Sequence, residues 1–478
     1  MEPQAHQLHV FFFPFMANGH IIPMIDIARL FAVRGTKCTL VTTPHNTSLF
    51  SKAIDQGIQA GLDISAAIIP FPAAEVGLPE GCESYDYITT LEMDLKFIKA
   101  LTLLQHPFDQ LLEKVHPDCI VADMFFTWAS DVGSKHGIPT ISFHGSGFFS
   151  WCLSNRMKDY NIESVAETFM VSGLPDQIEM TRSHMKTGPY KDAMDGVEKS
   201  EQKCFGVLWN TFYELEPAYV ELYKEVTGRR AWSIGPVSLY NTSVTAKTQR
   251  GKRSMFDEHR CLEWLDSKEP NSVIYISFGS ISLYQTAQFH EIAMGLEASE
   301  VPFIWVVRLA KNKEHEEILP RGFEKRVEGK GLIIKDWAPQ MLILDHPAVG
   351  GFMTHCGWNS TLEGITAGLP MITWPVFAEQ FDNEKLVTQV LDTGISAGNG
   401  VWSLWIIQEN VTVTKEMVKT AVTQLMSKEE EAADRRRRAR KLGEMAKRAV
   451  DEGGSSYNDL TALLEELRLH RQKSGSNG

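Results

Sequence analysis

The chain has 478 residues, of which 43% are hydrophobic and 22% are charged, and its formal net charge is −13 at pH 7. This length exceeds what one hydrophobic core usually serves, so we expect two or three domains of an ordinary globular type. The negative charge argues against a nucleic-acid surface, and the lack of any run of about 20 apolar residues argues against a membrane span.

Seven cysteines are scattered along the chain without C-x-x-C spacing. An odd number in a chain of this length is not typical of a disulfide framework, so we expect reduced thiols and a cytoplasmic protein. The N-terminus lacks the basic stretch of a secretory signal peptide, which agrees with that expectation.

Short apolar strands alternate with longer amphipathic helices along the whole chain. This alternation predicts the α/β class, with parallel sheets joined by right-handed crossovers. The expected strands are Leu8–Phe13, Cys38–Thr43, Ala66–Phe71, Asp118–Ala122, Thr140–Phe143, Gly206–Trp209, Val273–Ser277, Phe303–Val307, Leu332–Lys335, Val349–Met353 and Met371–Trp374. The expected helices include Pro23–Val33, Leu91–Val115, Gln285–Ala298 and Glu379–Leu391.

A histidine, His20, follows the first expected strand and begins a helix whose first turn holds Pro23. Ligands of open α/β sheets bind at the carboxyl ends of the strands. The positive end of a helix disfavours an imidazolium, so a neutral His20 could remove a proton from a hydroxyl. A purely structural histidine is the alternative that these residues leave open.

Asp123 follows the expected strand Asp118–Ala122, again at a carboxyl end. A carboxylate there could bond the far nitrogen of His20, fix its tautomer and stabilise the protonated ring. A helix N-cap is an equally good interpretation of this aspartate. Asp118 precedes the strand, and we expect it to lie far from the site.

Aromatic residues gather near the ends of the early strands and could line an apolar pocket, although such residues more often belong to the core. The candidates for this pocket are Phe15, Met16, Phe125, His144 and Phe148.

A polar, basic stretch without periodicity spans residues 241–254 and is the expected linker between two halves. The last residues of the chain, 470–478, look like a disordered tail.

The segment Trp337–Gln380 carries the densest set of groups suited to a nucleotide sugar. A strand feeds a helix through a small-residue turn, which directs free backbone N–H groups toward a bound anion. Asn359 and Ser360 add side-chain donors and His355 adds a ring nitrogen. The pattern predicts a diphosphate site that needs no metal.

Other side chains of this segment fit the remaining parts of such a ligand. Trp337 offers a flat face on which a base can stack, and Glu363 could accept hydrogen bonds from ribose hydroxyls. Glu379 and Gln380 end the segment and could bond the hydroxyls of a sugar.

The start W-A-P-Q, the centre H-C-G-W-N-S and the end E-Q of this segment resemble the 44-residue signature of plant family 1 UDP-dependent glycosyltransferases. The resemblance extends to about residue 465 and is closest to members that act on flavonoids and triterpenoids. It implies a GT-B fold, in which two Rossmann-like domains face each other across a cleft. An acceptor-binding domain at 1–240 and a UDP-sugar-binding domain at 255–452 are then expected, with a helix at 453–469 that crosses back to the N-terminal domain.

The resemblance also implies roles for individual residues. His20 becomes the catalytic base and Asp123 its partner. The turn S-F-G-S at 277–280 is similar to one whose last serine reaches the diphosphate. The implied donor-binding residues are Ser280, Trp337, Ala338, Gln340, His355, Gly357, Trp358, Asn359, Ser360, Glu363, Glu379 and Gln380.

The expected reaction is a single displacement that inverts the anomeric carbon of a sugar. In the resembled family, a glutamine at the place of Gln380 is found more often in enzymes that transfer glucose than in those that transfer galactose. UDP-glucose is therefore the expected donor, with a small apolar acceptor. We expect no metal, no other cofactor, no nucleic acid and a monomer.

Other interpretations stay open. One is C-glycosyl transfer or a different UDP-sugar on the same scaffold. A sugar-nucleotide epimerase would need its own acid–base set in the second half, and a non-catalytic UDP-sugar-binding protein would not need both His20 and Asp123. A nicotinamide dehydrogenase would need G-x-G-x-x-G in the first βα turn, where it is missing.

Overall fold

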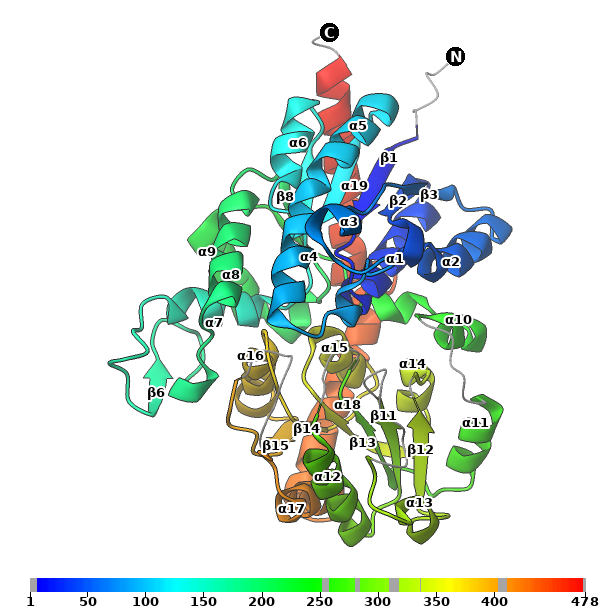
Figure 1. Ribbon diagram of the computed structural model, residues 1–478, viewed down its shortest axis with the longest axis vertical. Coiled ribbons are helices and arrows are strands. Elements are labelled where there is room, and N and C mark those ends of the chain that lie inside the picture. Colours follow the sequence, from blue (N-terminus) through cyan, green and yellow to red (C-terminus); the bar gives the residue numbers. More distant parts are fainter. Residues whose placement is uncertain are drawn as a thin grey trace.

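The computed structural model describes residues 7–251, 258–279, 284–308, 318–335, 337–402 and 411–475. Two parallel sheets, one from each half of the chain, lie one above the other, and helices pack around both (Figure 1). The predicted α/β architecture with two Rossmann-like units is confirmed. Among the described residues, no helix is long and apolar enough to cross a membrane.

The first sheet is built from seven parallel strands in the order β3-β2-β1-β4-β5-β8-β9. Its strands are β1 His9–Phe13, β2 Lys37–Thr42, β3 Ile64–Ile68, β4 Cys119–Asp123, β5 Thr140–His144, β8 Gly206–Trp209 and β9 Ala231–Ser233. A separate antiparallel hairpin is formed by β6 Thr168–Val171 and β7 Ile178–Thr181.

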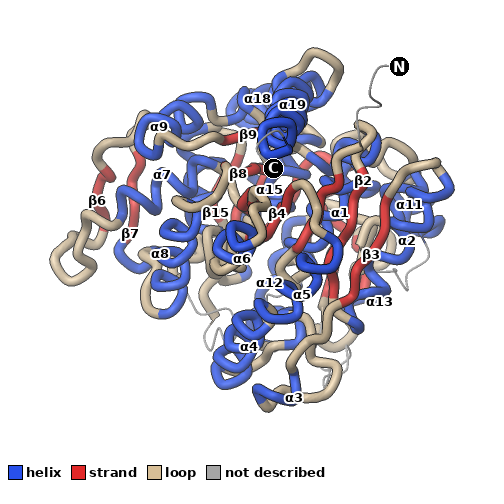
Figure 2. Tube along the Cα trace, turned by 90° about the horizontal axis from the view of Figure 1, so that it is seen from above, coloured by secondary structure: helices blue, strands red, loops and turns tan. Residues whose placement is uncertain are grey.

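Helices lie on both sides of the first sheet in the view from above (Figure 2). One apolar cluster joins this sheet to α1, α2 and α19, and another joins it to α3, α4, α5 and α6. The helices of this half are α1 Asn18–Val33, α2 Thr47–Gln59, α3 Ala73–Val76, α4 Leu91–Leu103, α5 Gln105–Val115, α6 Ala129–Lys135, α7 Phe148–Met157, α8 Pro189–Glu201, α9 Pro217–Thr227 and α10 Val244–Gln249.

The second sheet has six parallel strands in the order β12-β11-β10-β13-β14-β15. Its strands are β10 Val273–Ser277, β11 Phe303–Val307, β12 Gly331–Lys335, β13 Val349–Thr354, β14 Met371–Thr373 and β15 Gly394–Ser396. Its helices are α11 Glu258–Asp266, α12 Thr286–Ser299, α13 Phe323–Arg326, α14 Gln340–Leu344, α15 Trp358–Thr366, α16 Gln380–Lys385, α17 Lys415–Met426 and α18 Glu430–Val450.

Each sheet reverses its winding direction at one point. In the first sheet the chain winds outward in both directions from the neighbours β1 and β4, and in the second sheet from β10 and β13. Loops leave these central strands on opposite sides and open a crevice at their carboxyl ends, where ligands of such sheets bind. The loops after β1, β4, β10 and β13 therefore define where a site can form.

The long helix expected at Leu91–Val115 is two helices, α4 and α5, which meet at Leu104. Pro107 explains the break, because it has no N–H to donate to residue 103 and its ring clashes with that carbonyl. The helix expected at Glu379–Leu391 begins as α16 and continues as the π-helical turn Leu386–Val390. A π turn of this kind is common next to functional sites.

The C-terminal helix α19, Ser455–Gly475, runs six residues beyond its expected end at Leu469, into the stretch predicted to be a disordered tail. It packs along the first sheet through apolar residues of one face, among them Leu460 and Leu464. The Ser233 N–H at β9 donates to Asp459 over 2.7 Å, which fixes the helix against the edge strand.

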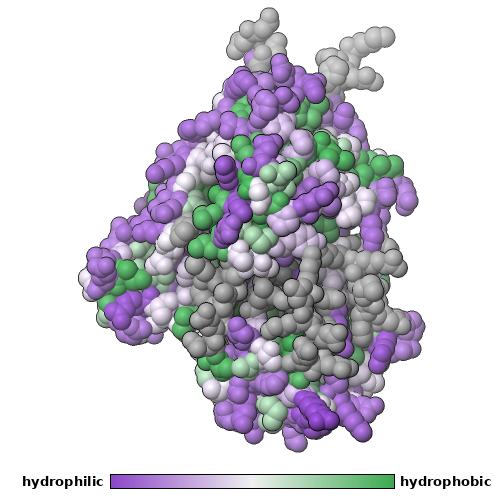
Figure 3. Space-filling model, in the orientation of Figure 1, coloured by the Kyte–Doolittle hydropathy of each residue, from purple (hydrophilic) through white to green (hydrophobic). Residues whose placement is uncertain are grey.

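The surface in Figure 3 is mostly hydrophilic at both ends, and apolar residues are interspersed on the upper half. Some of the exposed apolar side chains belong to α4, where Leu91, Leu95 and Ile98 are about half exposed. Arg435, the first of four consecutive arginines in α18, is buried and paired with Glu431, one turn earlier in the same helix.

Candidate active site

A cavity of about 590 Å³ lies at the carboxyl ends of the central strands of both sheets. Its walls come from both halves of the chain. Residues bordering it include His20, Phe125 and His144 from the first half and Trp337, His355 and Glu379 from the second.

His20 and Asp123 meet at one wall of this cavity. His20 lies in the first turn of α1 and Asp123 ends β4, and because β1 and β4 are neighbours, the two loops adjoin. The His20 Nδ1 is 2.7 Å from the Asp123 Oδ2. Asp123 is fully buried, whereas one fifth of the His20 side chain is exposed. With Nδ1 bonded to the carboxylate, Nε2 is the nitrogen left to take a proton from a substrate.

The helix N-cap interpretation of Asp123 is wrong, because the next helix, α6, begins only at Ala129 and has Trp128 at its N-cap. The second oxygen of Asp123, Oδ1, accepts a hydrogen bond of 3.2 Å from the Phe125 N–H in the turn that follows β4. Asp118, in contrast, lies at the other end of β4, where it accepts from the His9 N–H over 2.8 Å. It is therefore distant from the cavity, as expected.

The pKa of His20 is set by the carboxylate as well as by the helix terminus. Burial alone would lower the pKa of His20, but the charge and hydrogen bond of Asp123 raise this pKa above its ordinary value. The sequence-based expectation considered the effect of the helix terminus and left out this opposite effect of the carboxylate. A raised pKa makes His20 a stronger base.

Aromatic rings surround the exposed side of His20. The ring centroids of Phe15 and Phe125 lie 5.1 and 5.6 Å from that of His20, and both residues line the cavity. His144 also borders the cavity, and its ring stacks on Trp209 at 4.2 Å.

Two predicted pocket residues do not line this cavity. Met16 is buried in the cluster formed by α4 and its neighbours. Phe148 is completely buried and stacks on Trp209, with ring centroids 4.2 Å apart. Phe148 lies at the start of α7 and points into the core, a direction that its position after a strand did not reveal.

On the other wall, the turn between β13 and α15 holds His355. A β-carbon added to Gly279 would lie 2.5 Å from the His355 ring, and one added to Gly357 would also overlap it, so glycines on both sides make room for the imidazole. Burial lowers the pKa of His355 to about 4. The ring is therefore neutral at pH 7 and offers an N–H to an anion rather than a full charge.

Helix α15 begins at Trp358, and its N-terminal end faces the cavity with Gly357 and Ser360 among the lining residues. Backbone N–H groups at this end, together with the Ser360 hydroxyl, are suited to a diphosphate. Ser280, which was expected to join them, lies outside the described residues.

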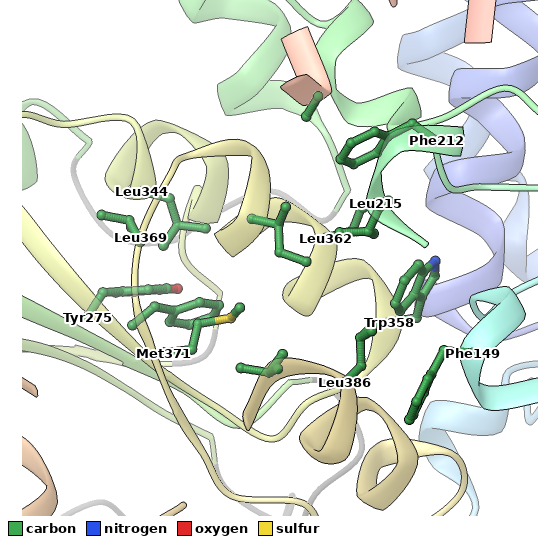
Figure 4. Packing of buried hydrophobic residues seen from close by; sticks show 14 of the residues in the cluster. Phe149, Phe212, Leu215, Tyr275, Leu344, Trp358, Leu362, Leu369, Met371 and Leu386 are labelled. Atoms are coloured by element: carbon green, nitrogen blue, oxygen red, sulfur yellow. The ribbon is translucent and has the colours of Figure 1, made fainter. Parts of the chain in front are cut away.

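Trp358 and Asn359 reach the opposite half of the molecule. The Trp358 indole N–H donates to the Asn210 carbonyl over 2.8 Å, and the ring lies beside Phe149 and Phe212 (Figure 4). The Asn359 side-chain amide donates to the Gly19 carbonyl over 2.5 Å, one residue before His20. Both residues border the cavity, but in this structure their polar hydrogens hold the two halves together.

Trp337, Ala338, Gln340 and Glu363, the residues expected around the base and the ribose, also border the cavity. The Gln340 Nε2 donates to the Ser360 Oγ over 3.1 Å and to the Glu363 Oε2 over 2.8 Å. Gln340 thus holds the carboxylate that was expected to accept from ribose.

Glu379 and Gln380 border the cavity near His20, and burial raises the pKa of Glu379. The Gln380 Oε1 accepts hydrogen bonds from the N–H groups of Val376 and Phe377, at 2.9 and 3.2 Å. This oxygen is therefore occupied, and only the NH₂ group of Gln380 is free to face a sugar. The expectation that Gln380 bonds sugar hydroxyls is therefore restricted to hydrogen bonds that its NH₂ group donates.

Sequence reasoning missed two cations of the cavity wall. Lys186, after β7, pairs with the buried Asp382 and donates to the Ser154 hydroxyl over 2.7 Å. Arg250, in the expected linker, pairs with Asp26 and with Glu363. Neither cation belongs to a motif, and its partners come from distant segments, so no local signal indicates it.

In the described part of the chain, no three histidine, cysteine or acidic residues group so that they could hold a metal ion.

Comparisons with known proteins agree with this geometry. Residues 240–429 match the family described as UDP-glucoronosyl and UDP-glucosyl transferase. A UDP-glucose flavonoid 3-O-glucosyltransferase of Fragaria ananassa is 52% identical, with 98% of each chain covered. A scopoletin glucosyltransferase of Nicotiana tabacum is 49% identical, with 97% of this chain and 98% of the relative covered.

A solved structure is similar over the same extent. The crystal structure of Glycyrrhiza uralensis UGT73P12 complexed with glycyrrhetinic acid 3-O-monoglucuronide superimposes with a TM-score of 0.92 at 39% identity, covering 98% of both chains.

Proposed function

Because the chain belongs to the family of UDP-glucuronosyl and UDP-glucosyl transferases, we propose that it moves glucose from UDP-glucose to a hydroxyl of a small apolar plant metabolite, such as a flavonoid or a triterpenoid. The chain is a UDP-dependent glycosyltransferase with a GT-B fold. The relatives act on a flavonoid and on scopoletin, and UGT73P12 binds a glycyrrhetinic acid glucuronide. These names support the acceptor class that we propose here.

One observation carries the mechanism: His20, bonded to Asp123 over 2.7 Å, borders the same cavity as the residues suited to a nucleotide sugar. The apolar rings of Phe15 and Phe125 beside His20 fit an aromatic or terpenoid acceptor. An acceptor hydroxyl against His20 and a donor in the second half would meet within this cavity.

We assign His20 the role of general base. Its Nε2 takes the proton of the acceptor hydroxyl, and the oxygen forms a bond to C1 of glucose while the bond from C1 to the UDP oxygen breaks. The electron pair of that bond leaves with UDP. Attack from the face opposite UDP inverts C1, so an α-linked donor yields a β-glucoside. Asp123 orients the ring and stabilises the imidazolium that forms.

The leaving diphosphate gains charge during this step. The N-terminal end of α15, the neutral His355 and the Ser360 hydroxyl supply N–H and O–H donors at the position where that charge develops. We propose that these donors replace a metal ion.

We propose that the glucose unit lies between Glu379, which accepts from sugar hydroxyls, and the NH₂ group of Gln380, which donates to them. The Gln380 oxygen already accepts two backbone hydrogen bonds, which supports these two roles. Gln380 can then only donate to the sugar, whereas the Glu379 carboxyl group mainly accepts from it. We further propose that the protein is cytoplasmic and works as a monomer.

A mass-spectrometric screen of phenolic and triterpenoid acceptors with several UDP-sugars tests the proposal. We expect a product that gains one hexose with UDP-glucose, and a proton NMR coupling at C1 that identifies the β-anomer. A sugar attached through carbon, or an α-glucoside, would contradict the mechanism. Binding of UDP-glucose without a product for any acceptor would favour a binding protein instead.

A further inference from the structure

Arg250 lies just after α10, in the segment that connects the two halves, yet only 11% of its side chain is exposed. Its Nε donates to the Asp26 Oδ2 on α1 over 2.7 Å, and a terminal nitrogen donates to the Glu363 Oε1 on α15. One guanidinium therefore joins a helix of each half.

The partners of Arg250 are themselves buried and bonded. Asp26 is 4% exposed and its Oδ1 accepts from the Asn241 side chain over 2.9 Å. Glu363 is 6% exposed, and its second oxygen accepts from Gln340 over 2.8 Å. Arg250 and Gln340 thus hold the two oxygens of Glu363 from different sides.

The next residue in the chain, Gly251, lies against Trp337. A β-carbon added to Gly251 would be 2.5 Å from a Trp337 ring carbon and 3.0 Å from the Ile22 Cδ1 of α1. Gly251 also has a φ of +90°, where other residues are strained. Residues 250 and 251 together therefore support the side chains that we assign to ribose and to the base.

Charge explains why Arg250 lies between these two carboxylates. Asp26 and Glu363 are both buried carboxylates, and a buried carboxylate without a cation is costly. The planar guanidinium of Arg250 can bond both carboxylates at once, which a lysine ammonium does with poorer geometry.

We propose that Arg250 is a positioning residue of the nucleoside site: it holds Glu363 aimed at the ribose hydroxyls, and it makes this site depend on Asp26 of the other half. The inference rests on the proposed function, because it takes Trp337 and Glu363 as the groups that bind the UDP nucleoside. Donor binding is then coupled to the alignment of the two halves through one side chain.

The test is the Kd of UDP, measured by calorimetry, together with kcat and KM for UDP-glucose in the same variants. Arg250→Gln removes the charge, and we expect the Kd of UDP and the KM to rise at least about tenfold, with a smaller change in kcat. Arg250→Lys keeps the charge and is expected to recover part of the affinity.

Lys247→Gln is the matched control. Lys247 lies one turn earlier in the same connecting segment and also borders the cavity, but its ion pair is with Asp345, over 2.5 Å, and not with Glu363. We expect its Kd for UDP to stay within about twofold of the unchanged protein, since an ion pair of this kind contributes little. An equal loss of UDP affinity in Lys247→Gln and Arg250→Gln would mean that the segment only connects the two halves and that Arg250 has no specific role in UDP binding.

A double-mutant cycle tests the link to the first half. Asp26→Asn should weaken UDP binding, and adding it to Arg250→Gln should weaken binding by less than the product of the two separate effects. Circular dichroism melting of each variant identifies one that fails to fold, and Arg250→Lys then remains as the informative variant.

Unchanged or tighter UDP binding in Arg250→Gln, or a lysine variant no better than the glutamine one, would overturn the inference while the proposed function stands. Failure of the unchanged protein to bind UDP would overturn both.

Discussion

In the mechanism that we propose, the strength of His20 as a base depends on one hydrogen bond to Asp123. The carboxylate raises the pKa of His20, so the acid limb of the pH–rate profile should lie above the ordinary histidine value of about 6.5. Asp123→Asn removes the charge, and the acid limb should move to lower pH. We also expect the plateau rate to fall by roughly 10²–10⁴, because asparagine favours the wrong tautomer.

The pH dependence of kcat/KM for both proteins measures this shift. An acid limb that stays in place after Asp123→Asn would mean that another group titrates in the profile.

Gln380 should select the donor through its NH₂ group alone. We expect UDP-glucose to react faster than UDP-galactose, UDP-xylose and UDP-glucuronate. Gln380→Glu keeps an oxygen for the Val376 and Phe377 N–H groups but replaces the NH₂ group by a second acceptor. The KM for UDP-glucose should therefore rise about tenfold or more.

UDP itself provides the control, because it lacks the sugar: its Kd should be nearly the same in Gln380→Glu and in the unchanged protein. A parallel loss of UDP affinity would place Gln380 at the diphosphate, and a preference for another UDP-sugar would refute glucose as the donor.

At the scale of elements, we propose that the N-terminal end of α15 stabilises the diphosphate in place of a metal ion. Its N–H groups and the neutral His355 are fixed in the fold, so we expect full activity after dialysis against EDTA. Assays with and without added magnesium measure this directly. Loss of activity that magnesium specifically restores would contradict the assignment of the diphosphate site.

Trp358, at the start of α15, should contribute more to stability than to donor contact. Its ring is 2% exposed, and its N–H bonds the Asn210 carbonyl across the two halves. We expect Trp358→Ala to destabilise the protein by about 3–5 kcal/mol and Trp358→Phe to cost roughly 0.5–1.5 kcal/mol beyond the change in size. Thermal melting of both variants and of the unchanged protein measures these losses of stability. Melting temperatures equal to that of the unchanged protein would refute the stabilising role of Trp358.

Sequence patterns predicted the presence of helices and strands more accurately than the residues at which they begin and end. The strands β1, β10 and β11 are runs of apolar residues that sheets bury on both faces, and they were predicted within a residue. The short strands β9 and β15, of three residues each, have too little pattern to be recognised. The break before α5 followed from Pro107, which sequence reasoning passed over.

The site shows the same division. Predicted residues of the contiguous segment 337–380, among them Trp337, His355 and Glu379, border one cavity, because short turns join the strands and helices of this segment. Arg250 and Lys186 were missed because their partners, among them Glu363 and Asp382, come from other elements. Phe148 was misplaced because an aromatic residue after a strand can face either a pocket or the core.

For the whole molecule, the central feature is that the residues proposed as the base and as the donor site belong to different halves that meet at one cavity. His20 and Asp123 come from the first sheet, and Trp337, His355 and Glu363 come from the second. Chemistry and donor binding should therefore be separable by mutation, which a site built on one sheet would not allow.

Isothermal titration of UDP combined with a transfer assay on His20→Ala tests this separation most directly. We predict that transfer to a hydroxyl acceptor falls by about a hundredfold or more, while the Kd of UDP stays within about twofold of the unchanged protein. Near-normal transfer by His20→Ala would contradict the assignment of the base, and a large loss of UDP affinity would contradict the division of roles between the two halves.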